Sequence, residues 1–186
     1  MMTEEPFFYF LKNGLIVIEN GNINIFRGLN IIIPARLIIY LRNILIEKFG
    51  KDISKEILFK LGEYQTRQAI ERYKIIFEIE KEYTKKLFNF FEDIISTLGL
   101  GKSKINIIYK DDGTLLEMLL YNNPIAIEFK LVGMTSEEPI DDYIRGLIYG
   151  GVKSILKTNI EKIEIVETKC IALGDEYCKF EVRNKN

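Results

Sequence analysis

Residues 163–182, near the C-terminus, contain both cysteines of the chain and constrain its fold more than any other stretch. Hydrophobic and polar residues alternate before Cys170 and again from Cys178 onward, with the period of two that is typical of half-buried β-strands. Gly174 and Asp175 lie between these runs and suit a turn, because glycine reaches positive φ and aspartate tolerates it. We therefore predict a β-hairpin with one cysteine on each arm.

The length of the hairpin loop decides what the two cysteines can do. A three-residue loop centred on Gly174 would pair Cys170 with Cys178 on one face of the hairpin, with their Cβ atoms roughly 5 Å apart. A two-residue loop would instead send the two side chains to opposite faces. Side by side, the cysteines can form a reduced pair in the core, a disulfide bond, or two thiolate ligands of one metal ion. The spacing leaves all three open.

Glu167 precedes the first cysteine and favours the metal. It is in phase with the isoleucines of its strand, so a regular strand would point its carboxylate toward the core. A buried carboxylate without a partner is costly and normally binds a cation or a metal ion. Glu167 and Cys170 are three residues apart and would face opposite sides of an unbroken strand. A metal site shared by Glu167, Cys170 and Cys178 therefore requires a bulge or bend at residues 168–169.

The composition excludes several function classes. The 186 residues contain no histidine, which removes histidine-based triads, histidine general bases and histidine metal ligands. A net charge of −1 provides no basic surface for nucleic acid, and we find neither a membrane-spanning apolar run nor a signal peptide. We expect one cytoplasmic domain at residues 14–183, preceded by an apolar arm at residues 1–13. Abundant Ile, Lys and Glu with little Gln indicate a thermophilic source.

Hydrophobic periodicity divides the rest of the chain into strands and helices. Asn20-Gly21 predicts a type I′ turn between two short strands. Apolar residues at helical spacing predict four helices, at residues 34–49, 52–73, 81–98 and 140–156. Alternating residues predict a three-stranded antiparallel meander, at residues 105–109, 115–121 and 125–131. The predicted fold class is therefore mixed α+β, an antiparallel sheet flanked by helices, with two β-hairpins plus a meander.

The last predicted helix contains two glycines that need an explanation. Thr135 and Glu138 have the spacing of a capping box and predict its start. Gly146 and Gly150 each cost about 1 kcal/mol of helix stability relative to alanine. They are four residues apart and share one helix face, so we expect that face to approach the sheet or another helix closely.

The pattern Glu167-x2-Cys170-x7-Cys178-x-Phe180, with the elements that precede it, resembles the 4-vinyl-reductase domain family. The resemblance implies an α/β ligand-binding domain, usually dimeric, that holds a small hydrophobic molecule in an internal cavity. Relatives of this kind include the sensor domains of aromatic-responsive transcription activators.

The resemblance also implies a zinc site. In the aromatic sensors, a Glu and two Cys at this spacing bind zinc together with another Cys on the preceding helix. Glu167, Cys170 and Cys178 match the first three of these ligands. The helix predicted at residues 140–156 contains no cysteine, so water, Asp141 or Asp142, or a group from another subunit, would have to complete the set.

We expect a non-enzymatic small-molecule-binding or sensor domain that encloses a hydrophobic guest, with zinc as its candidate cofactor. The candidate lining residues are Ile127, Phe129 and Ile165. The expected partners are the hydrophobic ligand and a second copy of the chain, forming a homodimer, without direct contact to nucleic acid or membrane.

Two alternative functions stay open. A reductase acting on a vinyl-substituted tetrapyrrole would suit the family's name, but the sequence shows neither a nucleotide-binding fingerprint nor a convergent polar constellation. A thiol-based redox sensor would use Cys170 and Cys178, beside which Lys169 and Lys179 could favour the thiolate form.

Overall fold

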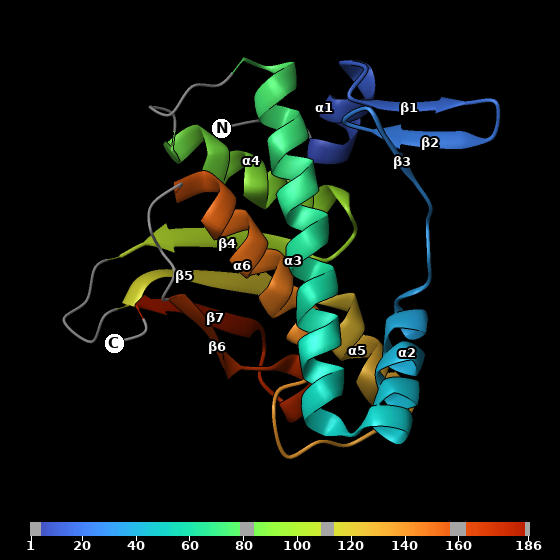
Figure 1. Ribbon diagram of the computed structural model, residues 1–186, viewed down its shortest axis with the longest axis vertical. Helices are drawn as coiled ribbons and strands as arrows, with labels where there is room; N and C mark the ends of the chain where they lie inside the picture. The colour runs from blue at the N-terminus through green and yellow to red at the C-terminus, as the bar shows by residue number, and fades with distance from the viewer. Residues whose placement is uncertain (1–4, 79–83, 109–113, 157–162, 185–186) are drawn as a thin grey trace.

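The computed structural model describes residues 5–78, 84–108, 114–156 and 163–184. Its main sheet is antiparallel and has four strands, in the order β4 (Lys102–Ile107), β5 (Thr114–Tyr121), β7 (Cys178–Asn184) and β6 (Ile163–Lys169). A smaller antiparallel sheet lies beside the N-terminal helix α1 (Pro6–Lys12) and consists of β1 (Ile16–Glu19), β2 (Asn22–Ile25) and β3 (Gly28–Asn30) (Figure 1).

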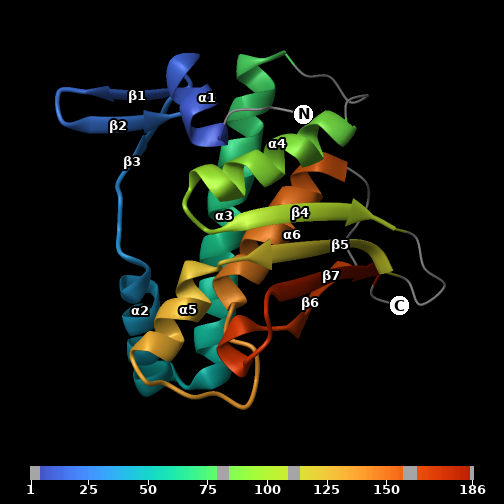
Figure 2. The ribbon, with the colours of Figure 1, turned by 180° about the vertical axis from the view of Figure 1, so that it is seen from behind.

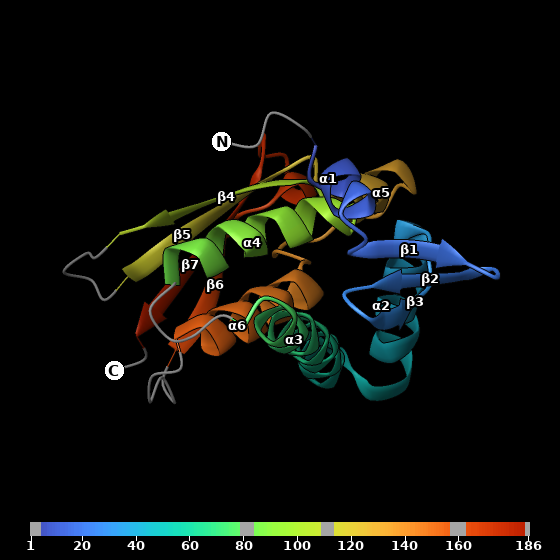
Figure 3. The ribbon, with the colours of Figure 1, turned by 90° about the horizontal axis from the view of Figure 1, so that it is seen from above.

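Helices are layered on one face of the main sheet. The other helices of the described residues are α2 (Ala35–Phe49), α3 (Lys51–Ile76), α4 (Thr84–Thr97), α5 (Pro124–Leu131) and α6 (Asp142–Leu156). A short 3-10 helix, η1 (Ile171–Leu173), lies in the loop between β6 and β7. Figure 1 shows α3 in front of α6, and Figure 2 shows the sheet on the other side of α6, so α6 is the middle layer. Figure 3 shows α4 beside α6 under the same sheet.

The two faces of the main sheet differ in polarity. Met118 and Leu120 of β5 and Phe180 of β7 are fully buried against the helices. On the opposite face, Lys179 Nζ lies 2.9 Å from a carboxylate oxygen of Glu117 and 3.0 Å from one of Glu181. One apolar and one charged face is the usual pattern of an antiparallel sheet that is covered on one side. The core therefore lies between this sheet and α6.

The expected close approach of the glycine face is confirmed, and its partner is α3. A Cβ atom added at Gly146 would lie 2.7 Å from the carbonyl carbon of Phe59, and one added at Gly150 would lie 3.0 Å from that of Glu63. Gly62 of α3 faces the backbone of α6 in the same way. The absence of side chains at these positions lets the two helices pack backbone against backbone.

The mixed α+β class is confirmed, together with the first hairpin. Asn20 and Gly21 have φ values of 50° and 78° between the paired residues Glu19 and Asn22, as a type I′ turn requires. Helices occupy all four segments predicted to be helical, with shifted ends. The predicted helix start at residue 81 and the turn at residues 111–113 lie outside the described residues.

The third strand of the predicted meander is wrong, because residues 125–131 belong to α5. Asn123 caps this helix by accepting a hydrogen bond from the N–H of Ile125 (3.1 Å), and Pro124 occupies its first turn. A short apolar run fits a buried helix as well as a strand. As a result, Ile127 and Phe129 do not share a face: Phe129 is buried, whereas Ile127 is 36% exposed.

The predicted capping box at Thr135 is also wrong, because α6 begins at Asp142. The hydroxyl of Ser136 accepts a hydrogen bond from the N–H of Glu138 and donates one to its carbonyl, which closes a local turn instead. The carbonyl of Asp141 accepts the N–H of Arg145 (2.8 Å), so Asp141 has the N-cap position.

The N-terminal helix packs on its own chain through a second apolar cluster. The rings of Phe10 and Phe26 lie 5.3 Å apart, and those of Phe26 and Phe90 lie 5.2 Å apart. Ile16 and Ile94 complete the buried part of this cluster. The division into an arm at residues 1–13 and a domain at residues 14–183 stays a prediction.

Asp93 of α4 provides a test of this region. Burial, with a smaller contribution from Glu92, raises the pKa of Asp93 to about 6 from 3.8. Between about pH 4 and 6 the unfolded chain therefore binds fewer protons than the folded one, and the free energy of unfolding falls as the pH rises. We expect Asp93→Asn to raise this free energy by about 1.5 kcal/mol at pH 7.5. This value is half of the free energy that the whole pKa change would give, because the carboxyl group is partly solvated.

The measurement is urea denaturation at pH 7.5 and at pH 4, where the Asp93→Asn effect should vanish. Glu47→Gln, at an exposed position of α2, serves as the control and should change stability at neither pH. An equal effect of Asp93→Asn at both pH values would contradict the raised pKa.

Candidate metal site

Asp141 reaches the interior from the start of α6. Its side chain is 1% exposed, and its Oδ2 accepts a hydrogen bond from Asn123 Nδ2 (2.8 Å). The neighbouring Asp142 points elsewhere and forms an ion pair with Arg145 (3.0 Å). Of the two aspartates that could complete the ligand set, the fold therefore brings Asp141 to the site.

Glu167 lies near the end of β6 and faces the core, as its phase with Ile163 and Ile165 predicts. Glu167 pairs with Phe180, but the next pair is Lys169 with Lys179, so Thr168 is an extra residue on its strand. The bulge expected at residues 168–169 is confirmed. It reverses the alternation beyond Glu167 and allows Cys170 to face the same side as the glutamate.

The loop between the two cysteines is neither the three-residue nor the two-residue turn that the sequence left open. Cys170 lies just beyond β6, and η1 follows it, whereas Cys178 is the first residue of β7. Asp175 closes the loop: its Oδ2 accepts the N–H of Cys170 (2.8 Å). Gly174 has a φ of 106° and ends η1. The cysteines therefore meet through a folded loop rather than as a pair in the strand ladder.

Four buried side chains converge at this point. One potential ligand atom each from Asp141, Glu167, Cys170 and Cys178 lies within 4.8 Å of all the others. Asp141 Oδ2 is 3.2 Å from the sulfur of Cys178 and 3.7 Å from that of Cys170, and both cysteines are free thiols. The structure thus brings together all three predicted ligands and adds Asp141.

Three of the four carboxyl oxygens of this cluster lack a hydrogen-bond partner within the part of the chain that the structure describes. Asp141 Oδ1 and both oxygens of Glu167 are buried and have no hydrogen-bond partner among the described residues. Carboxylate oxygens only accept hydrogen bonds, so two carboxylates that face each other need a shared proton or a cation between them. A cluster of four acidic groups with three such oxygens has the chemistry of a cation site.

The pKa values of the four side chains in the cluster also indicate a site for a cation. Burial raises the pKa of Asp141, and burial with the nearby Asp141 raises the pKa of Glu167 to about 12. The Cys170 side chain and burial raise the pKa of the Cys178 thiol, whereas the contact with Cys178 lowers that of Cys170. A metal ion would replace the retained protons, so its binding should release protons and strengthen as the pH rises.

The donor set fits zinc. Zinc binds thiolate sulfur and carboxylate oxygen, and structural zinc sites are four-coordinate and closed to solvent. Backbone and amide N–H groups support the ligands: the N–H of Ile171 lies 3.4 Å from Cys178 Sγ, and Asn123 Nδ2 lies 3.5 Å from it. Such outer partners are typical of protein metal sites. The site joins the start of α6, the end of β6 and the start of β7.

Asn123 is a site residue that the sequence prediction missed, because the predicted meander places residues 122–124 between two strands. The signal that could have found it is the order Asn-Pro, which is typical of an N-cap followed by the first helical residue.

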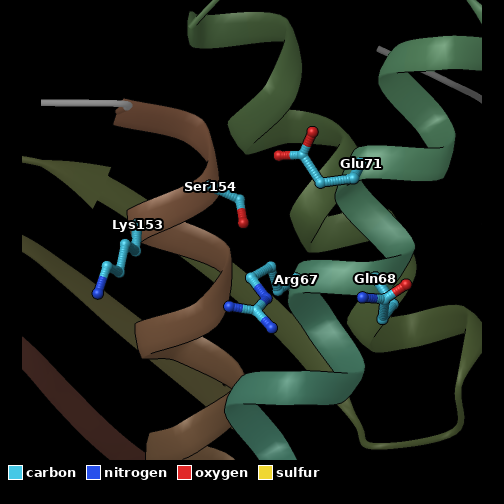
Figure 4. A pocket seen from close by; sticks show the side chains of 5 residues that line it. All are labelled: Arg67, Gln68, Glu71, Lys153 and Ser154. Atoms are coloured by element: carbon cyan, nitrogen blue, oxygen red, sulfur yellow. The ribbon is translucent and has the colours of Figure 1, made fainter.

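The predicted lining residues do not line a groove that is found among the described residues. This groove, of about 320 Å³, lies between α3 and α6 and is lined by Arg67, Gln68, Glu71, Lys153 and Ser154 (Figure 4). Phe129 and Ile165 lie in the main core instead. All five residues that line this groove are polar or charged, and none of them is a predicted lining residue. Lining of an internal cavity by Ile127, Phe129 and Ile165 stays a prediction.

No family model and no curated protein matches the sequence. Solved structures match the fold. The phenol-responsive sensory domain of the transcription activator PoxR, crystallised with phenol, superimposes with a TM-score of 0.77 at 13% identity, over 92% of this chain and 86% of that one. A vinyl-4-reductase family protein from Methanocaldococcus jannaschii matches with a TM-score of 0.56 at 20% identity, over 84% and 85% of the two chains. The chain has a vinyl-4-reductase-like fold.

A third structure shares this vinyl-4-reductase-like fold. Trafficking protein particle complex subunit 3 from Naegleria fowleri, covalently bound to palmitic acid, matches with a TM-score of 0.52 at 18% identity, over 82% of this chain and 95% of that one. The fold resemblance inferred from the C-terminal pattern is therefore confirmed. Among the described helices, none is long and apolar enough to cross a membrane.

Proposed function

We propose that this chain is a small-molecule-binding sensory domain whose C-terminal end is held by a structural zinc ion. Asp141, Glu167, Cys170 and Cys178 would bind the ion. The observation that carries the proposal is the buried cluster itself, in which three carboxylate oxygens without partners lie beside two free thiols. Zinc bound there would link α6, β6 and β7, whose side chains form a large part of the main core.

Two of the similar structures support the binding of an apolar guest. One contains phenol, and the other is covalently bound to palmitic acid. The core of this chain, between the main sheet and the helices, is rich in phenylalanine and isoleucine, whereas histidine and tryptophan are absent from the sequence. A purely apolar ligand suits such surroundings better than a phenol, which needs a hydrogen-bond partner.

Native mass spectrometry of freshly purified protein tests both parts of the proposal. We expect one zinc ion per chain and an additional mass for an apolar guest, and the same spectrum reports whether the chain forms the expected dimer. Cys170→Ser combined with Cys178→Ser should abolish zinc binding, because two of the four ligands are lost.

Three results would count against the proposal. Stoichiometric zinc in the double variant would contradict the assigned ligands, and metal-free wild-type protein with both thiols reduced would contradict the zinc site. A wild-type mass that is 2 Da lower would show a disulfide bond and would favour the thiol-based redox sensor.

A further inference from the structure

Asn123 connects the candidate zinc ligands to α5. Its side chain is 0% exposed, and both ends of its amide are used. The oxygen accepts the N–H of Ile125 (3.1 Å), which caps α5. The nitrogen donates to Asp141 Oδ2 (2.8 Å) and lies 3.5 Å from Cys178 Sγ.

The orientation of this amide is determined by its surroundings. If the amide of Asn123 were flipped, its oxygen would face the carboxylate of Asp141 and its nitrogen would face the N–H of Ile125. An acceptor would then face an acceptor and a donor would face a donor, so two hydrogen bonds would be lost. The two N–H donors therefore point to the carboxylate and the sulfur, which both carry negative charge when they bind a metal ion.

We propose that Asn123 is a positioning residue of the zinc site, an inference that rests on the proposed function. Two thiolates and two carboxylates carry more negative charge than a divalent ion neutralises, and N–H donors stabilise the excess. Asn123 supplies donors to Asp141 and Cys178 from a fourth segment of the chain, just before α5. Because the same side chain caps α5, it holds the ligands at a defined place relative to that helix.

Two variants separate the donors of Asn123 from its capping role. Asn123→Asp keeps an oxygen that can cap α5 but replaces the donor nitrogen with a second acceptor. Asn123→Ser keeps a capping hydroxyl and removes the amide nitrogen. We expect zinc affinity, measured by competition with a chromophoric chelator, to fall 10- to 100-fold in both variants. The larger loss is expected for Asn123→Asp, because it adds a negative charge beside Asp141.

The matched control is Asn122→Asp, the same chemical change at the exposed neighbouring residue. It should leave the zinc affinity within twofold of wild type. Cobalt(II) substitution provides a second readout, since the thiolate-to-cobalt absorption should shift when Cys178 loses its amide donor. Urea denaturation of the metal-free variants shows whether α5 is still capped.

The outcomes separate this inference from the proposed function. Wild-type protein that binds no zinc would remove both. If wild-type protein binds zinc but both Asn123 variants keep its zinc affinity and cobalt spectrum, the role of Asn123 is overturned and the proposed function stands. If Asn123→Asp does not fold, the zinc affinity and cobalt spectrum of Asn123→Ser decide the question.

Discussion

Replacing Asp141 with asparagine is expected to lower the zinc affinity of the domain about 100-fold. Structural zinc contributes roughly 10–16 kcal/mol in small domains, so one of four ligands accounts for about 3 kcal/mol, or two orders of magnitude. Asparagine has nearly the same shape but lacks the charge that Asp141 would bring to the ion. Competition with a chromophoric chelator measures the change, and the melting temperature with and without zinc gives an independent value.

Two further variants sharpen the Asp141 experiment. Asp142→Asn removes the adjacent buried carboxylate, which pairs with Arg145 and not with the cluster, so zinc affinity should remain that of wild type. Asp141→Cys introduces the thiolate that the family resemblance implies on this helix, and it should bind zinc more tightly than Asp141→Asn does. Wild-type affinity in Asp141→Asn would show that Asp141 is not a ligand.

Gly146→Ala is expected to lower the free energy of unfolding by about 2 kcal/mol. Alanine favours a helix over glycine by about 1 kcal/mol, but overpacking of a core costs roughly 1–3 kcal/mol and occasionally more. The clash should dominate here because the new methyl group meets the backbone of Phe59, which cannot rotate away as a side chain can. Urea denaturation measures the change.

Lys153→Ala is the control for Gly146→Ala, since Lys153 is exposed on the same helix. It should change the free energy of unfolding by no more than about 0.5 kcal/mol. A Gly146→Ala variant as stable as wild type would show that α3 and α6 separate without cost, which would contradict backbone-to-backbone packing as the reason for the glycine.

Together, the Asp141 and Gly146 experiments test one helix in two roles. The glycine face of α6 sets its distance from α3, and the residue before its first turn supplies a side chain to the candidate metal site. A shift of α6 by a methyl group would also move Asp141 relative to Glu167 and the cysteines. We therefore expect Gly146→Ala to weaken zinc binding as well.

Local sequence was sufficient to predict the part of the site that lies on β6. Strand periodicity points Glu167 inward, and the odd separation from Cys170 requires the bulge that the structure contains. The glycine pair on α6 likewise predicted a close contact, although not its partner. These features follow from the period of strand or helix, which depends only on neighbouring residues.

The tertiary structure decided what periodicity could not. Residues 125–131 are apolar enough for a strand or a helix, and the Asn123 cap with Pro124 and burial of Phe129 select the helix. Asp141 and Asp142 looked equivalent in the sequence, but only Asp141 faces the cluster. Asp141 and Glu167 are 26 positions apart, and their meeting depends on how α6 packs beneath the sheet. The sequence by itself determined that Glu167 faces the core from β6 and that Gly146 and Gly150 share one close-packed face of α6, because both follow from local spacing. The docking of α6 determined which distant side chains share a site.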